Sequence, residues 1–150
     1  MVMLSTRGRY GLKAMIDLAA IYGETRLSAA TLAQLQGVSD TYLEQLVSAL
    51  KKAGLVVSTR GAQGGYELAR APEEINVNEV LRALEGDTIL IDCVSATRVD
   101  CLNACTCSAR PLWLKLQNRI NEVLDSTTLK DMADDYRIQL ERSTDEENLS

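Results

Sequence analysis

Four cysteines carry the most distinctive chemistry of this chain, and all lie within the fifteen residues from 93 to 107. They are Cys93, Cys101, Cys105 and Cys107. Four thiolates can ligate a [2Fe-2S] or [4Fe-4S] cluster, or a tetrahedral zinc ion. Zinc sites usually show paired C-x2-C spacings, which this sequence lacks. Iron-sulfur binding is therefore the favoured interpretation, while zinc binding, thiol redox chemistry and a plain cluster of reduced cysteines stay open.

The sequence contains no histidine. This absence excludes Ser-His and Cys-His catalytic pairs and histidine-ligated metal sites. No nucleophile, base and orienting group occur together in the sequence, so we expect a protein that is not an enzyme.

The charge of the chain is divided unevenly along its length. The formal net charge is −5, which taken alone argues against a nucleic-acid partner. Residues 1–70, however, hold eight basic and five acidic residues, a net of +3, and residues 71–150 hold eight and sixteen, a net of −8. The two parts are expected to face different partners.

Length and composition predict a soluble globular protein. The chain has 150 residues, 46% of them hydrophobic and 25% charged. No apolar run reaches the length of a transmembrane helix, and the first ten residues do not resemble a signal peptide. We therefore expect a cytoplasmic protein without a membrane partner.

The elements that must position any functional residue are mainly helical. Apolar residues recur at helical spacing over residues 10–22 and 40–52, and Ser28 is placed to cap a short helix that ends near Gln36. We expect Leu32, Ala33 and Leu35 to point inward from that short helix. The two later helices, joined by a turn containing Gly37, predict a helix-turn-helix.

A β-hairpin follows, with strands at residues 55–60 and 66–69 joined by a glycine-rich turn. A hairpin in this position is a wing. Asn76 and Glu79 predict a capping box for a helix that ends at Gly86. Residues 1–86 are thus predicted to form a winged helix-turn-helix domain.

The second half is predicted to contain three further segments. The cysteines lie in a sensor loop, residues 87–110. Residues 111–140 form a long helix, which begins at Pro111 and carries Leu112, Leu116, Ile120, Val123 and Leu124, and a short helix that starts after Thr128. Residues 141–150 are expected to be a disordered acidic tail.

Several residues of the positive half suit DNA binding. A recognition helix over 40–52 would present Thr41, Tyr42, Glu44 and Gln45 to bases and phosphates. Arg60 suits a minor groove, since Gly61 and Gly64 would allow the backbone to approach closely. The complete set of candidate DNA-binding residues is Arg7, Arg9, Lys13, Ser28, Ser39, Thr41, Tyr42, Glu44, Gln45, Arg60, Gly61 and Gly64.

The sequence resembles the Rrf-type family of bacterial winged-helix transcription regulators, the IscR, NsrR and CymR group, and most of all IscR. Three segments carry the resemblance: LSTRGRYGL at residues 4–12, SDTYLEQL at 39–46 and RGAQGGY at 60–66. It implies a homodimer that pairs through the long helix from Pro111, and a double-stranded DNA operator. It also implies a base-reading role for Glu44 and a minor-groove role for Arg60.

The resemblance also bears on the cysteines. Members that sense through iron-sulfur clusters place three cysteines before the dimerisation helix, and Cys93, Cys101 and Cys107 fit that placement. The IscR histidine ligand is replaced by Arg110 here, and Cys105 is additional. We therefore expect a transcription regulator, most simply a repressor, controlled by an iron-sulfur cluster, [2Fe-2S] rather than [4Fe-4S], with Cys105 as the fourth ligand.

Two alternatives remain. A cluster-free regulator of cysteine or sulfur metabolism would respond to thiol oxidation or to a protein partner, as the CymR branch does. From another class, an iron-sulfur electron-transfer protein would use the same cysteines without needing the DNA-binding residues.

Overall fold

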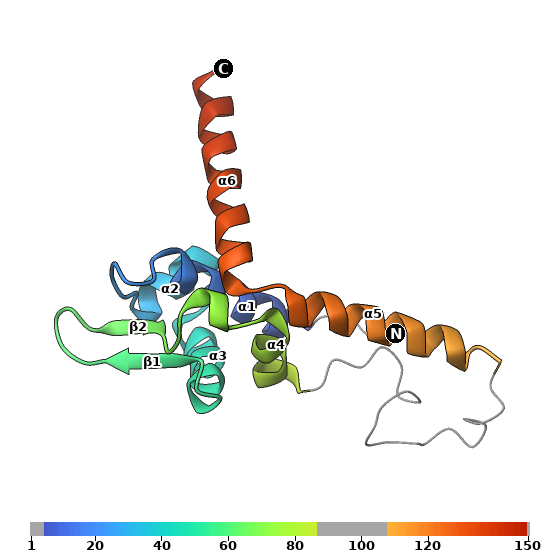
Figure 1. Cartoon of the computed structure of the whole chain (residues 1–150). Coiled ribbons are helices and arrows are strands. Elements are labelled where there is room, and N and C mark those ends of the chain that lie inside the picture. Colours follow the sequence, from blue (N-terminus) through green and yellow to red (C-terminus); the bar gives the residue numbers. More distant parts are fainter. Residues whose placement is uncertain (1–4, 87–107, 150) are drawn as a thin grey trace.

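Three helices, each begun by a serine, form the N-terminal part of the protein (Figure 1). The computed structural model describes residues 5–86 and 108–149. Ser5, Ser28 and Ser39 each accept a hydrogen bond from a backbone N–H in the first turn, which satisfies a donor that the helix itself leaves unpaired. The helices are α1 (Thr6–Ala20), α2 (Ala29–Gln36) and α3 (Asp40–Lys52). The predicted helix-turn-helix is confirmed, although α1 begins four residues earlier than the apolar pattern indicated.

The hairpin that follows α3 is also present. Strand β1 (Val56–Thr59) pairs antiparallel with β2 (Gly65–Leu68), with Val56 opposite Leu68 and Thr59 opposite Gly65. Tyr66 exchanges two backbone hydrogen bonds with Leu27, the residue before the cap of α2. The wing is therefore attached to the helix-turn-helix by main-chain contacts and not only by its own sequence neighbours.

A short 3-10 helix, η1 (Pro72–Glu74), leads into α4 (Val77–Glu85). The predicted capping box is confirmed: Asn76 Oδ1 accepts from Glu79 N at 2.9 Å, and Glu79 Oε2 accepts from Asn76 N at 3.0 Å.

Two long helices complete the described structure, α5 (Arg110–Ser126) and α6 (Leu129–Asn148). Thr128 and Asp131 form a second capping box at the start of α6. The expected end of this helix near Leu140 was wrong, because α6 continues to Asn148 and so includes residues 141–148 of the tail expected to be disordered over 141–150. Figure 1 shows α5 and α6 extending from the body of the protein in two different directions.

The hydrophobic core draws on both halves of the chain. Its fully buried members include Met15, Leu32, Leu43 and Leu50 from the three N-terminal helices. Leu129 and Ala133 of α6 belong to the same cluster, with 0% and 3% of their surface exposed. The winged-helix body is thus completed by a helix that begins more than forty residues after α4 ends.

One predicted core residue is not buried. Leu35 of α2 is 59% exposed, whereas Leu32 and Ala33 are buried as expected. Consecutive positions on a helix are separated by about 100°, so Leu35 falls beside the core-facing stripe and lines a surface groove instead.

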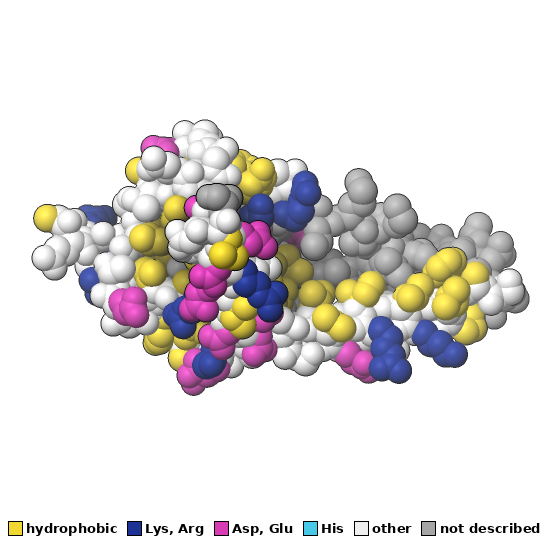
Figure 2. Space-filling view, turned by 90° about the horizontal axis from the view of Figure 1, so that it is seen from above, with side chains coloured by type: hydrophobic (Ala, Val, Ile, Leu, Met, Phe, Trp, Pro, Cys, Tyr) yellow, Lys and Arg dark blue, Asp and Glu magenta, His cyan; other side chains and the backbone are white. Residues whose placement is uncertain are grey.

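The apolar side chains of α5 are largely exposed. Leu112, Leu116 and Val123 are 53%, 40% and 61% exposed, respectively. Figure 2 shows hydrophobic side chains gathered along the arm of the molecule that α5 forms. Within the described ranges, no helix is both long enough and apolar enough to span a bilayer.

Candidate nucleic-acid interface

The outward face of α3 carries polar side chains, and the opposite face is buried. Leu43, Leu46, Val47 and Leu50 are at most 1% exposed, which fixes the rotation of the helix about its axis. The residues that consequently face solvent recur three, four and seven positions apart, and they are Thr41, Glu44, Gln45 and Ser48. Amide, hydroxyl and carboxylate groups on an exposed helix can hydrogen-bond to base edges in a major groove.

The serines Ser28 and Ser39 stand at the N-termini of α2 and α3. Ser28 Oγ accepts from Thr31 N at 3.1 Å, and Ser39 Oγ accepts from Tyr42 N at 3.1 Å. Both are exposed, so each helix presents a capped N-terminus to solvent, where the helix dipole favours a phosphate. Their observed contacts give both serines a structural role as caps, and phosphate binding remains a prediction.

Tyr42 differs from its expected exposure. The ring is half-buried and meets the ring of Tyr10 edge-on, with the centroids 6.4 Å apart. Lys13 Nζ lies over the ring of Tyr10, 5.3 Å from its centroid. Tyr42 was expected to be an exposed contact residue, but part of its surface packs α3 against α1.

Arg7 lies beside the recognition face. Together with Thr41, Glu44, Gln45 and Ser48 it lines one shallow hollow on the surface. Its Nε donates to the carbonyl oxygen of Leu84 in α4 at 2.8 Å. Arginine is always protonated, so this hollow holds a fixed positive charge next to the polar groups of α3.

A glycine allows α1 to lie this close to α4. A Cβ atom at Gly11 would stand 2.3 Å from Leu84 Cδ1, far inside contact distance. Nearby, Glu85 accepts hydrogen bonds from both the backbone N–H and the hydroxyl of Ser5. The C-terminal end of α4 therefore fixes the start of α1, and with it the place of Arg7.

Arg9 and Lys13, predicted alongside Arg7, occupy a different surface. They line a groove between α1, α2 and α6, together with Leu35, Tyr136 and other residues. The structure thus separates Arg9 and Lys13 from the hollow that contains Arg7. The sequence could not make this distinction, because all three residues precede or open the same helix.

Asp17 lies in the same groove, where Gln36 donates a hydrogen bond to its carboxylate. Burial raises the pKa of Asp17 above its ordinary value, and the Gln36 hydrogen bond and the charge of Lys13 oppose that rise only in part.

The wing places Arg60 directly after β1. It is exposed and precedes the turn at residues 62 and 63, so it stands at the end of a strand rather than at the tip of the hairpin. Gly61 has φ of 107°, a conformation that L side chains avoid. A Cβ on Gly64 would stand 2.2 Å from the carbonyl oxygen of Thr59, so this glycine is needed to close the turn.

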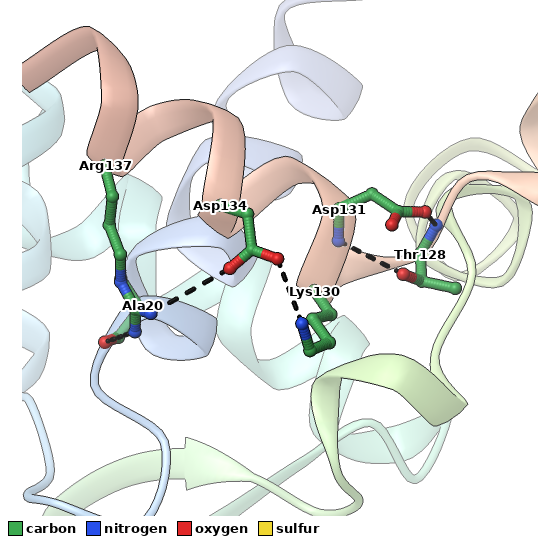
Figure 3. Close-up of polar contacts among 6 residues, drawn as sticks. All are labelled: Ala20, Thr128, Lys130, Asp131, Asp134 and Arg137. Carbon is green, nitrogen blue, oxygen red and sulfur yellow. Dashed lines mark hydrogen bonds and ion pairs between the residues drawn. The ribbon is translucent and has the colours of Figure 1, made fainter.

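Polar contacts stabilise the N-terminal half of α6, and one of them joins this helix to α1 (Figure 3). Arg137 Nη2 donates to the carbonyl oxygen of Ala20 at 2.7 Å, and Lys130 pairs with Asp134 at 3.0 Å. Hydrogen bonds from the backbone and the hydroxyl of Thr128 lower the pKa of Asp131. The Arg137 contact joins α6 to α1, the helix that carries Arg7, whereas the other contacts lie within α6 and its N-terminal cap.

Ser48 is a member of the hollow that was absent from the sequence prediction. It follows Thr41 by seven residues and Glu44 by four, so helical periodicity alone places it on the same face. This spacing could have predicted Ser48 as a residue of the outward face of α3.

The four cysteines, Cys93, Cys101, Cys105 and Cys107, lie outside the described residues. Within residues 5–86 and 108–149, no group of three or more Cys, Asp or Glu side chains is arranged to hold a metal ion.

Comparison with known proteins gives a consistent result. Residues 4–135 match the model of the Rrf2 family, described as "Iron-dependent Transcriptional regulator". The chain is 45% identical to the HTH-type transcriptional regulator CymR of Bacillus subtilis over 130 residues, 87% of this chain and 88% of that protein. It is 36% identical to the regulator IscR of Aliivibrio salmonicida, over 97% of this chain and 84% of the relative.

Solved structures agree with these relationships. The structure of CymR, "the Global Cysteine Regulator of B. subtilis", matches with a TM-score of 0.74 and 44% identity, covering 89% of this chain and 98% of that one. T. potens IscR matches with a TM-score of 0.70 and 45% identity, covering 90% and 88%. The winged-helix fold and the absence of an enzymatic role, both expected from the sequence, are thereby confirmed. The chain belongs to the Rrf2 family of transcriptional regulators.

Proposed function

We propose that this protein is a dimeric regulator whose affinity for its DNA operator is controlled by an iron-sulfur cluster. The observation that supports DNA binding best is the polar face of α3, flanked by Arg7 and by the arginine-bearing wing. In a winged helix-turn-helix, such a face enters the major groove and the wing reaches the adjacent minor groove. We assign base contacts to Glu44 and Gln45, phosphate contacts to Arg7 and the capped helix ends, and a minor-groove contact to Arg60.

The exposed stripe of α5 supports dimerisation. Leu112, Leu116 and Val123 expose much of their surface on a helix that projects from the body. Contiguous exposed apolar surface is a mark of an interface. A second copy of α5 would cover this stripe and set two recognition helices at the spacing of two half-sites, about one turn of DNA apart.

Cysteine chemistry and one arginine support a cluster. The candidate ligands are Cys93, Cys101, Cys105 and Cys107, and an all-thiolate [2Fe-2S] cluster carries net negative charge. Arg110, three residues after the last of them, has a buried Nε without a hydrogen-bond partner in the described part of the chain. A buried cationic donor requires an acceptor, and an anionic cluster would provide one. When bound, such a cluster supplies one-electron redox chemistry.

The contacts of α4 support a connection between a cluster and the DNA-binding face. Helix α4 ends at Glu85, two residues before the segment 87–107 that bears the cysteines. The same end of α4 holds Arg7 beside the recognition face. A cluster that stabilises one arrangement of the α4 end over another would therefore alter the fit of both recognition helices to an operator.

Anaerobic purification tests the proposal. We expect a visible absorption band, matching amounts of iron and sulfide, and a promoter-shift affinity that changes when the cluster is removed. Cys101→Ala should abolish cluster binding, and Cys105→Ala should weaken it if Cys105 is the fourth ligand. A Cys105→Ala protein that holds as much iron and sulfide as the parent would remove Cys105 from the ligand set.

The second candidate is a cluster-free regulator that responds to thiol oxidation or to a partner protein. Its support is the 45% identity to CymR of Bacillus subtilis, whose structure is described as that of a cysteine regulator. A colourless anaerobic protein whose DNA affinity changes with a thiol oxidant would favour this candidate. The electron-transfer alternative is set aside, because the chain belongs to a family of transcriptional regulators.

A further inference from the structure

Glu44 presents an electrostatic problem for a DNA-binding face. Its carboxylate is exposed at the centre of the outward face of α3. The phosphate backbones on both sides of a major groove repel a negative charge, so an isolated glutamate weakens binding to most sequences. It reads a base only where a cytosine amino group offers a hydrogen bond that offsets the repulsion.

The hollow that contains Glu44 also contains a positive charge from another helix. Arg7 of α1 lines it together with four residues of α3. The positive charge of Arg7 offsets the negative charge of Glu44, so this hollow repels DNA phosphates less than Glu44 alone would. Arg9, only two residues away in the sequence, lines the groove on the other side of α1.

The position of Arg7 is fixed by α4. Its Nε donates to Leu84 O at 2.8 Å, and the close approach of α1 to α4 depends on Gly11. A guanidinium has five N–H donors in a rigid plane, so the contact through Nε leaves the two terminal nitrogens for other partners.

We propose that Arg7 is a specificity-determining residue that acts as a pair with Glu44. Anchored on α4, Arg7 supplies the charge that lets the Glu44 carboxylate approach a base between two phosphate backbones. Arg7 is then more than a general phosphate contact, because its contribution to operator affinity depends on the presence of Glu44. This inference rests on the proposed DNA-binding function.

A double-mutant cycle on the full-length protein tests the pair. An operator is first selected from a random DNA library by the parent protein, and its affinity is measured for Arg7→Ala, Glu44→Gln and the double variant. We expect the loss caused by Arg7→Ala to be at least about fivefold smaller in the Glu44→Gln background, a coupling typical of interacting residues. If Arg7→Ala fails to fold by circular dichroism, Arg7→Gln, which also removes the positive charge but keeps a polar side chain, takes its place in the cycle.

Arg9→Ala is the matched control, since it removes the same charge from the same helix outside the hollow. The loss of affinity of the Arg9→Ala, Glu44→Gln double variant should equal the product of the two single losses, within about twofold. If the loss caused by Arg7→Ala is also the same with and without Glu44→Gln, the pairing is wrong, while the proposed DNA binding still stands. If the parent protein enriches no sequence at all, the proposed function itself fails, and the pairing fails with it.

Discussion

Arg137 of α6 donates a hydrogen bond to the carbonyl oxygen of Ala20, the last residue of α1, across 117 positions of sequence (Figure 3). The last carbonyls of a helix have no partner within the helix and carry partial negative charge. A guanidinium at this point both satisfies an acceptor and complements the helix dipole. It joins the C-terminal helix to the helix that carries Arg7.

Arg137→Ala should therefore lower the free energy of unfolding by about 0.5–1 kcal/mol, the contribution of one partly exposed charged hydrogen bond at a helix end. Urea denaturation measures the change. Arg142→Ala removes the same charge from an exposed position further along α6 and should leave stability unaltered. Equal losses for the two variants would mean that net charge, and not the contact with Ala20, is responsible.

Gly11→Ala should destabilise the protein by about 1–3 kcal/mol, because the added methyl group would overlap the side chain of Leu84. Alanine is the better helix former, so a variant as stable as the parent would show that Leu84 moves aside without cost. Thermal unfolding measures the effect. The Gly11→Ala, Leu84→Ala double variant should lose less free energy of unfolding than the sum of the two single losses. The shortened side chain at position 84 leaves room for the methyl group at position 11, which in turn fills part of the cavity.

Glu44→Ala should relax discrimination at one operator position by about 1–3 kcal/mol, the range for a single base contact. Binding to the selected operator and to operators changed at each position measures this. Glu24→Ala, which removes an exposed carboxylate from the turn after α1, should leave the preferences unchanged. A uniform gain or loss over all sequences for Glu44→Ala would rule out a base-reading role.

Asp131 should make the stability of α6 dependent on pH. Hydrogen bonds from Thr128 lower the pKa of Asp131 in the folded protein, so its carboxylate stabilises the fold above the unfolded pKa of about 3.9. This contribution should shrink as the pH falls below about 4 and vanish below the folded pKa. The difference in unfolding free energy between the parent and Asp131→Asn should follow the same course. A difference that persists unchanged at pH 2 would contradict the assignment.

Local chemistry explains which parts of the fold could be predicted from sequence. Ser28, Asn76 and Thr128 were predicted to begin helices, and each does so, because a cap depends on residues only three positions away. The alternating pattern of the hairpin and the buried stripe of α3 are equally local. The length of α6 was underestimated, since the polar composition of residues 141–148 gave no apolar stripe to follow.

Tertiary contacts explain what the sequence could not show. Arg7, Arg9 and Lys13 form one basic group in the sequence, and only the packing of α1 against α4 and α6 sends Arg7 to one surface and the others to another. Tyr42 was assigned to the exposed face because its partner Tyr10 is 32 positions away. The cysteine site stays a prediction, because its ligands lie outside the described residues.

The junction between α5 and α6 forms backbone hydrogen bonds with the residues at the start of α4. Val77 N donates to Thr127 O and Leu129 N donates to Ile75 O, both at 2.9 Å, while the Leu129 side chain completes the core. The two described ranges, residues 5–86 and 108–149, are therefore joined by main-chain hydrogen bonds and by shared core packing. If the chain is cut between residues 86 and 108, these contacts should keep the two fragments associated, and size-exclusion chromatography of the cut protein would measure this.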